Sequence, residues 1–192
     1  MIIMLSGYKR SGKDTVANYL VNEYGFTRYG FADPIKEISY ILFDWKKEDD
    51  EVLKEVIDER YGFSRRQFWQ YFGTEWAQYQ LPNQFAEFSK KIGRNFWVKK
   101  FENLYKSNPN INYVISDYRF PHEYEVLKEY NPKCIQIHRD IVASDCHESE
   151  KYINDLHTNY YLKNDCDLIQ LERRVKTIMS FIIVDEPCHH TL

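Results

Sequence analysis

Residues 7–15, Gly-Tyr-Lys-Arg-Ser-Gly-Lys-Asp-Thr, have the types and spacing of a phosphate-binding loop. The form is G-x-x-x-x-G-K. It lies between an apolar run at 2–5 and a helical pattern that begins at Val16, which is the strand, loop and helix context that the motif requires. Gly7 and Gly12 permit the tight path that turns backbone N–H groups onto phosphate oxygens, and the following helix adds its positive N-terminal end. The motif predicts binding of nucleotide phosphates.

The side chains of the loop add charge to this cradle. Lys13 is placed to reach the β- and γ-phosphates. Lys9 and Arg10 supply two further cations, as expected where the charge of a transferring phosphoryl group must be neutralised. The expected nucleotide-binding residues are Gly7, Lys9, Arg10, Ser11, Gly12, Lys13, Asp14 and Thr15.

One position departs from the usual pattern. Asp14 stands where a Ser or Thr normally offers its hydroxyl to magnesium. Either Thr15 takes that role, or Asp14 holds the ion through a water molecule. Both residues are therefore candidate contacts of Mg²⁺.

Composition excludes several other classes of protein. The chain of 192 residues is long enough to bury a core and predicts one domain, and a net charge of −3 argues against a surface that coats a nucleic-acid polymer. The four cysteines form no C-x-x-C pair, and no stretch resembles a signal sequence or spans a bilayer. We expect a cytoplasmic protein without a membrane partner.

Apolar runs at 2–5, 26–31, 113–116, 134–138 and 160–163 read as strands that alternate with helical patterns. This order predicts an α/β fold with a doubly wound parallel sheet. Gly25 is expected to cap the first helix, and Asp33 is expected to be the N-cap of the second, with Pro34 at its first position. The charged run at 44–60 is interpreted as a solvated or mobile segment with a possible helix at 52–57.

The helix that begins at Ser64 combines polar and aromatic side chains. Ser64 and Gln67 form a capping-box pattern, and Arg66 shares a face with Gln70. Gly73 and Thr74 are expected to interrupt the helix, and Pro82 to end the region. Two interpretations stay open: the aromatics on the neighbouring face bind a nucleobase, or they pack an amphipathic helix. These aromatics are Trp69, Phe72 and Trp76.

Charged residues follow two of the predicted strands. Asp117, Arg119 and Glu123 come after 113–116, and Arg139 follows 134–138. Ligands bind at the carboxyl ends of parallel strands, although a structural ion pair would also explain the first group. The polar stretch at 140–150 is expected to close over a substrate. Cys188, His189 and His190 lack further ligands at the spacing of a metal site.

Five motifs together resemble the deoxynucleoside monophosphate kinases of bacteriophages and large DNA viruses, in the P-loop nucleoside monophosphate kinase superfamily. They lie at 9–15 (KRSGKDT), 31–36 (FADPIK), 66–76 (RQ-x-x-Q, then GTEW), 117–123 (D-x-RFP-x-E) and 139–150 (R, then H-x-SE). The resemblance covers most of the chain. Gln78 and His122 depart from it, since Arg and Asn are the expected residues there.

This resemblance implies a P-loop kinase fold with a five-stranded parallel sheet, helices on both faces, a helical monophosphate-binding arm and a lid. The core would comprise 1–32, 110–139 and 157–185, the arm 33–100, and the lid 140–152. ATP with Mg²⁺ would occupy the loop, and the chain would be a monomer or homodimer. The implied acceptor-binding residues are Asp33, Lys36, Arg66, Trp69, Gln70, Phe72, Trp76, Asp117, Arg119 and Glu150.

The implied activity is ATP-dependent phosphorylation of deoxynucleoside monophosphates for DNA synthesis. Phosphoryl transfer depends mainly on positioning and on electrostatic stabilisation, here by Lys13, Arg10, Arg119, Arg139 and Mg²⁺. Two alternatives remain. The first is a phosphomevalonate kinase, since the kinases of this kind in animals carry a similar loop. The second is a regulatory protein that binds nucleotide without transferring phosphate.

Overall fold

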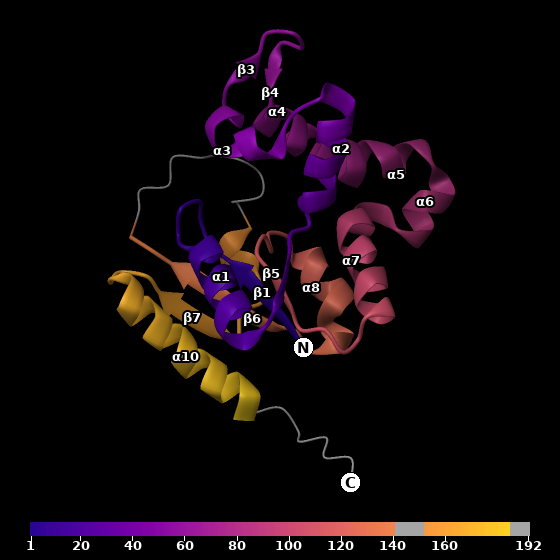
Figure 1. The fold of residues 1–192 in the computed structure, drawn as a ribbon. Coiled ribbons are helices and arrows are strands. Elements are labelled where there is room, and N and C mark those ends of the chain that lie inside the picture. Colours follow the sequence, from indigo (N-terminus) through magenta and orange to yellow (C-terminus); the bar gives the residue numbers. More distant parts are fainter. Residues whose placement is uncertain (141–151, 185–192) are drawn as a thin grey trace. The chain divides into compact units, whose positions relative to one another are not determined.

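The computed structural model describes residues 1–140 and 152–184. The chain divides into two compact units, which we describe separately. The sheet unit comprises 1–29 and the chain from 108 onward, and the helical unit comprises 30–107. Figure 1 shows their elements along the chain.

The sheet unit is built on five parallel strands in the order β2-β5-β1-β6-β7. Their bounds are Ile2–Ser6 (β1), Thr27–Tyr29 (β2), Tyr113–Ile115 (β5), Lys133–His138 (β6) and Tyr160–Lys163 (β7). In register, Met4 of β1 lies between Ile115 and Cys134. Every residue of β1 is buried because helices cover both faces of the sheet. The predicted α/β fold with a five-stranded parallel sheet is confirmed.

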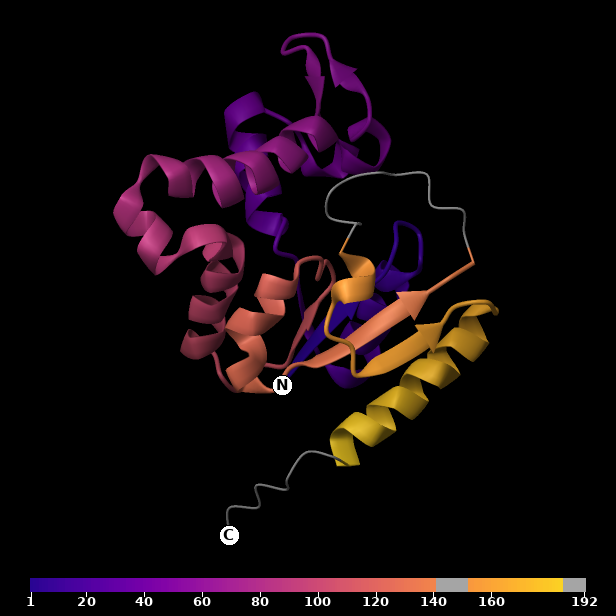
Figure 2. The ribbon, with the colours of Figure 1, turned by 180° about the vertical axis from the view of Figure 1, so that it is seen from behind.

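Helices α1 (Lys13–Tyr24) and α10 (Leu168–Val184) cover one face of this sheet. Seen from behind in Figure 2, α8 (Pro121–Leu127) lies on the other face. Apolar side chains at helical spacing on α1 and α10 pack with β1, β6 and β7 in one core, which includes Val16, Leu20, Leu171, Val175 and Met179. As predicted, Gly25 caps α1 in the left-handed conformation. The short 3₁₀ turns η4 (Lys128–Tyr130) and η5 (Ile153–Asp155) complete the unit.

The helical unit holds eleven elements. They are α2 (Asp33–Phe43), η1 (Lys47–Asp49), α3 (Asp50–Leu53), β3 (Ile57–Asp58), β4 (Phe63–Ser64), α4 (Arg65–Gln70), η2 (Tyr71–Gln80), α5 (Leu81–Gln84), α6 (Ala86–Lys91), η3 (Gly93–Asn95) and α7 (Phe96–Ser107). Strands β3 and β4 pair as an antiparallel hairpin.

The prediction that Asp33 is the N-cap of α2 is wrong. Ala32 holds that position, Asp33 is the first helical residue, and Pro34 follows it. The Asp33 carboxylate instead accepts a hydrogen bond from the backbone N–H of Gly30 at 2.7 Å. Because the side chain reaches back to the preceding turn, it fixes the entry of the chain into the helix one residue earlier than expected.

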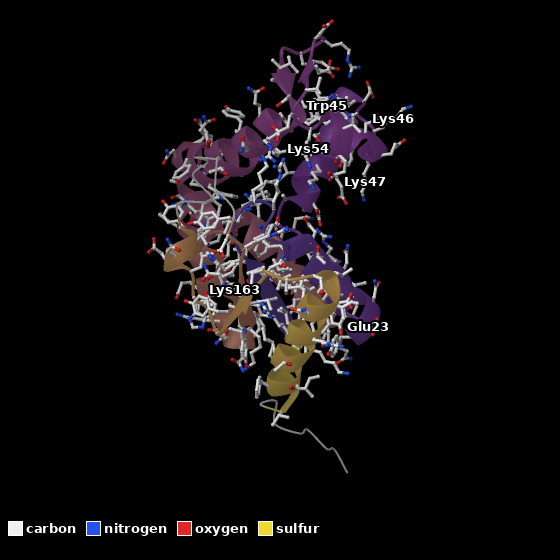
Figure 3. The ribbon with its side chains drawn as sticks, turned by 90° about the vertical axis from the view of Figure 1, so that its left-hand side faces the viewer. Glu23, Trp45, Lys46, Lys47, Lys54 and Lys163 are labelled. Carbon is white, nitrogen blue, oxygen red and sulfur yellow. The ribbon has the colours of Figure 1, made fainter. Side chains whose placement is uncertain are left out.

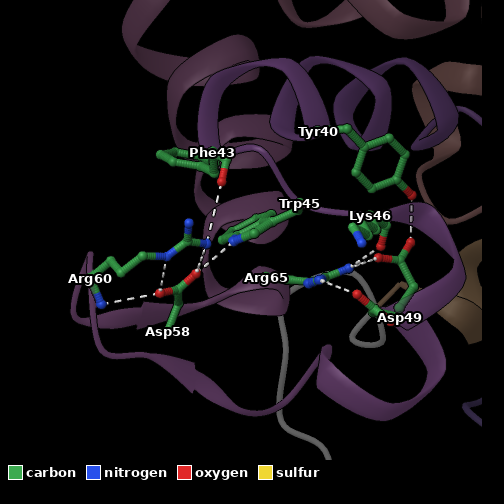
Figure 4. A network of polar contacts seen from close by, with 9 residues as sticks. Tyr40, Phe43, Trp45, Lys46, Asp49, Asp58, Arg60 and Arg65 are labelled. Carbon is green, nitrogen blue, oxygen red and sulfur yellow. Dashed lines mark hydrogen bonds and ion pairs between the residues drawn. The ribbon is translucent and has the colours of Figure 1, made fainter.

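The charged segment at 44–60 is more ordered than the prediction of a solvated or mobile segment. It contains η1, α3 and β3, although Lys46 and Lys47 do point outward, as Figure 3 shows. The buried Trp45 donates its indole N–H to Asp58 at 2.8 Å, and the guanidinium of Arg60 holds the same carboxylate at 2.7 Å (Figure 4). The expected helix at 52–57 is shorter than predicted: α3 ends at Leu53, and Ile57 begins the first strand of the hairpin.

A second part of the network in Figure 4 centres on Arg65, whose side chain is buried. Its guanidinium contacts the carbonyl of Lys46 at 2.7 Å and the carboxylate of Asp50 at 2.5 Å. The hydroxyl of Tyr40 donates to the same carboxylate at 2.5 Å. The hydrogen bonds satisfy a buried ion pair, so Arg65 joins α4 to α2 and α3.

The predicted interruption at Gly73 and Thr74 is wrong. The chain continues from α4 into the π-helix η2, where hydrogen bonds span five residues, and Ser64 and Gln67 form the predicted capping box at the start of α4. A Cβ on Gly73 would lie 2.6 Å from Cδ1 of Ile35, so glycine permits close contact with α2. Pro82 does not end the region either, because α5 follows η2 directly and Pro82 stands in its first turn.

Candidate functional site

The backbone of the phosphate-binding loop explains both of its glycines. Gly7 and Gly12 have φ angles of 142° and 105°, and Arg10 also lies in the left-handed region at 64°. A Cβ on Gly7 would lie 2.4 Å from the carbonyl oxygen of Ile137, and one on Gly12 would lie 2.4 Å from Nδ2 of Asn164. Conformation and space therefore both require glycine, which leaves the backbone N–H groups accessible to an anion.

Lys13 is the first residue of α1 and points into the loop. Its ammonium donates hydrogen bonds to the carbonyls of Gly7 at 2.7 Å and Tyr8 at 2.8 Å. The hydroxyl of Ser11 is buried and has no hydrogen-bond partner within the described residues. The Lys13 cation thus lies inside a loop whose shape suits phosphate oxygens, and Ser11 adds a buried hydroxyl without a partner among the described residues.

Asn164 holds this loop in place and was not identified from the sequence. It follows β7, its buried amide donates to the carbonyl of Ser11 at 2.8 Å, and its backbone N–H donates to His138 at 2.7 Å. The rule that ligands and their supports gather at carboxyl ends of parallel strands applies to this residue as it does to Asp117. A polar residue after the fifth strand was the available signal.

The exposed Asp14 and Thr15 lie in the first turn of α1. The Asp14 carboxylate forms an ion pair with Arg28 of β2. Arg28 also contacts Asn18 and Ser116 and was not identified from the sequence. Within the described residues, no group of three or more His, Cys, Asp or Glu side chains is placed to hold a metal ion.

The topology of the sheet unit brings three predicted positions to one edge. The phosphate loop follows β1, Asp117 follows β5, and Arg139 follows β6. Because β5 and β6 flank β1 and all three are parallel, their carboxyl ends lie side by side. The backbone N–H of Tyr118 donates to Leu5 at 3.2 Å and fixes the chain next to β1. The exposed side chains of Arg119 and Arg139 belong to this edge.

Glu123 supports the edge as a helix cap. Its buried carboxylate accepts backbone N–H groups from Arg119 at 2.8 Å and Phe120 at 3.0 Å. Burial raises the pKa of Glu123 to about 8, although the two hydrogen bonds act in the opposite direction. The neutral acid keeps a carbonyl oxygen for both donors. Glu123 therefore positions the backbone of Arg119.

In the helical unit, Lys36, Trp69 and Ser39 lie together. The Lys36 ammonium is 5.5 Å from the centroid of the Trp69 ring, and the indole N–H donates to the Ser39 hydroxyl at 2.9 Å. Arg66 pairs with Glu55 at 2.6 Å, and the side chain of Gln70 is half-buried. The Lys36–Trp69 pair joins two of the predicted acceptor-binding motifs, one on α2 and one on α4.

The aromatics of α4 and η2 form a row of stacked rings, Phe68, Phe72 and Trp76. The centroids of Phe68 and Phe72 are 5.4 Å apart at an interplanar angle of 15°, and those of Phe72 and Trp76 are 4.5 Å apart at 8°. A spacing of four residues places them on one helix face. The rings thus pack on one another, and the binding of a nucleobase by Phe72 and Trp76 stays a prediction.

A cavity of about 620 Å³ lies beside the hairpin of the helical unit. Phe43, Phe63, Phe68 and Tyr71 line it together with Gly62 and Gln67. None of these lining residues belongs to the predicted acceptor-binding set. The cavity therefore does not identify where an acceptor binds.

Gln78 and His122, the two departures from the family pattern, are both engaged. The buried Gln78 accepts a hydrogen bond from Nη2 of Arg94 at 3.3 Å, and the Arg94 guanidinium lies 4.4 Å from the Tyr79 ring centroid. Arg94 of η3 thus places a guanidinium beside residue 78, where the family resemblance led us to expect Arg. His122 stacks on Phe120 at 5.4 Å.

Glu150 lies outside the described residues, as do 141–151 of the predicted lid and the tail that carries Cys188, His189 and His190. Among the described helices, none combines the length and the apolar character that crossing a membrane requires.

Comparison with known proteins identifies relatives along most of the chain. The profile of the family "Deoxynucleotide monophosphate kinase" matches residues 1–54 and 42–175. A putative deoxynucleotide monophosphate kinase of Acanthamoeba polyphaga mimivirus is 36% identical over 155 residues, which cover 78% of this chain and 80% of the relative. The deoxynucleotide monophosphate kinase of Enterobacteria phage T4 is 50% identical over 36 residues, 19% of this chain and 15% of the phage protein.

Solved structures support the fold. A sugar kinase from a Janibacter species has a TM-score of 0.50 at 11% identity, over 93% of this chain and 94% of that one. This similarity concerns the fold alone. The extent of the match to the family profile and to the mimivirus protein shows that the chain belongs to the deoxynucleotide monophosphate kinase family.

Proposed function

We propose that this protein transfers the γ-phosphoryl group of ATP to deoxynucleoside monophosphates, which yields ADP and deoxynucleoside diphosphates for DNA synthesis. The observation that carries the proposal is the intact loop at 7–15, with the Lys13 ammonium inside it, in a chain that matches the kinase family over most of its length. We further propose that it acts as a monomer or homodimer in the cytoplasm, of a host cell if the protein is viral.

The loop fits the phosphates of ATP. Backbone N–H groups between Gly7 and Lys13 and the buried Ser11 hydroxyl would donate to phosphate oxygens, while Lys13 would exchange its carbonyl partners for the β- and γ-phosphates. Lys9 and Arg10 would add positive charge from the exposed side of the loop.

Magnesium fits beside Thr15, and less well as a direct ligand of Asp14. The exposed Thr15 hydroxyl is in the first turn of α1, whereas the Asp14 carboxylate is already paired with Arg28. We propose that Thr15 contacts the ion and that Asp14 reaches it only through water. When bound, Mg²⁺ neutralises charge on the β- and γ-phosphates.

We also propose the acceptor-binding residues that the family resemblance implies. From the helical unit we propose Asp33, Lys36, Arg66, Trp69, Gln70, Phe72 and Trp76, within a monophosphate-binding arm at about 33–100. A base stacked on Trp76 would extend the row of rings by one. Asp117 and Arg119 would contribute from the carboxyl end of β5, and Glu150 from a lid at about 140–152.

The transfer needs positioning and charge stabilisation. An oxygen of the acceptor phosphate attacks the γ-phosphorus, while the bond from that phosphorus to the bridging oxygen of ADP breaks. Lys13, Arg10, Arg119 and Arg139 would stabilise the charge on the transferring group, and we assign no general base.

The test is an assay of the purified chain with ATP, Mg²⁺ and a panel of deoxynucleoside monophosphates, which follows ADP and the diphosphate product together. Formation of a deoxynucleoside diphosphate in step with ADP supports the proposal. Ribonucleotides, phosphomevalonate and a reaction without acceptor are the comparisons. Turnover of phosphomevalonate alone would indicate a small-molecule kinase, and ATP binding without any turnover would indicate a regulatory protein.

A further inference from the structure

Arg28 of β2 is the centre of a set of contacts that the proposed mechanism does not use. Its Nη2 pairs with the Asp14 carboxylate, its Nη1 donates to the side-chain oxygen of Asn18 at 3.2 Å, and its Nε donates to the Ser116 hydroxyl at 3.3 Å. Asp14 and Asn18 lie one turn apart on α1, and Ser116 follows β5. The Arg28 guanidinium thus joins α1, the helix that follows the phosphate loop, to the end of β5.

The charge of Asp14 makes this contact important. The residue occupies the position where phosphate-binding loops carry a neutral hydroxyl, at the N-terminal turn that faces the phosphates. A carboxylate there would repel a triphosphate and would offset the positive potential of the helix end. A cation bound to that carboxylate removes the repulsion.

The same pair contributes little to folding. The side chains of Arg28 and Asp14 are 38% and 78% exposed, and ion pairs this accessible add little to the free energy of unfolding. A role in ligand binding and a role in stability therefore predict different measurements.

We propose that Arg28 is a positioning residue for the nucleotide. It neutralises Asp14 and fixes the first turn of α1 against the end of β5, so that the N-terminus of α1 presents positive potential to the phosphates. This inference rests on the proposed binding of ATP at the loop. In this proposal Asp14 forms an ion pair with Arg28 and does not bind the metal ion directly.

The experiment measures ATP affinity by calorimetry, with and without Mg²⁺, together with the melting temperature. Arg28→Met should weaken ATP binding about tenfold, the size of the coupling between one close pair of charges, and should do so at least as strongly without Mg²⁺. The melting temperature should stay within about 2 °C of the wild type, as for an exposed pair. Arg173→Met, a matched change at an exposed residue of α10, should leave ATP affinity unchanged.

Asp14→Asn supplies the decisive comparison. Combined with Arg28→Met, it should restore ATP binding without Mg²⁺ to within about threefold of the wild type, because no unpaired carboxylate remains. The inference is overturned if Arg28→Met binds ATP normally, if the double variant stays weak, or if Asp14→Asn alone removes the effect of Mg²⁺ on affinity. Lys13→Ala separates the two proposals, since normal ATP binding by that variant contradicts the nucleotide site itself.

Discussion

The phosphate loop of the sheet unit and the aromatic row of the helical unit are built on different principles. In the loop, function depends on the backbone, and Gly7 and Gly12 are fixed by their φ angles and by contacts that a Cβ would violate. In the row, Phe68, Phe72 and Trp76 contact one another through side chains. A site built from the backbone leaves a recognisable sequence pattern. Aromatic residues spaced four apart give the same pattern whether their rings bind a base or pack a helix.

The largest effect should come from the loop. We expect Lys13→Ala to lower kcat by about 10³-fold or more, because its ammonium lies inside the loop against the carbonyls of Gly7 and Tyr8 and is directed at the transferring phosphate. The measurement is single-turnover transfer from ATP to a deoxynucleoside monophosphate. Lys176→Ala on the exposed side of α10 is the matched control. A folded Lys13→Ala protein with normal turnover would contradict the assignment of this loop.

A substitution of Arg139 tests whether this edge of the sheet supplies the positive charge that stabilises the transition state. It follows β6, next to the strand that leads into the loop. We expect Arg139→Ala to reduce kcat by roughly 10³-fold while the Kd values of both nucleotides change little, as for arginines that act in the transition state. If kcat stays within a few-fold of the wild type, the role passes to Arg10 or Arg119.

A substitution of Gln70 tests the proposed acceptor-binding site of the helical unit, which is built from side chains. We expect Gln70→Ala to raise the KM of the acceptor about tenfold or to change base preference, since one lost polar contact to a substrate has this size. The KM of ATP should stay the same, because Gln70 belongs to the proposed acceptor motif and not to the phosphate loop. Gln84→Ala, at an exposed position of α5, is the control. A weakened ATP KM with a normal acceptor KM would reverse the assignment.

The last prediction concerns stability and pH. Because burial raises the pKa of Glu123 to about 8 from an ordinary value of 4.5, the folded protein keeps a proton that the unfolded chain releases. This stabilisation is complete below the unfolded value and is lost as pH rises through the folded one. We therefore expect the free energy of unfolding to fall as the pH is raised from about 5 to 8.

Glu123→Gln should flatten that dependence, because its amide keeps the acceptor for Arg119 and Phe120 and cannot ionise. Urea unfolding at several pH values measures it, with Glu125→Gln at an exposed position of α8 as the control. An unchanged slope in Glu123→Gln would show that another group titrates.

Much of the sheet unit could be predicted. The five strands alternate with helical patterns, and the G-x-x-x-x-G-K spacing fixes the loop between the first strand and helix, so the fold and the nucleotide-binding segment follow from local pattern. The helical unit was predicted less well. The ordered segment at 44–60 is held by the buried Arg65 and by Trp45, and Gly73 of the π-helix lies close to Ile35. These partners are far apart in the chain, so no local pattern indicates them.

The sequence by itself determined the phosphate loop, the parallel sheet and the family, because backbone conformation and hydrophobic period are encoded by adjacent residues. Only the tertiary structure decided what many individual side chains do. It paired Asp14 with Arg28, tied the loop to Asn164, turned Glu123 into a buried cap and stacked Phe72 on Trp76. Each of these depends on which strand end or helix face lies opposite, and sheet order and packing fix that at long range.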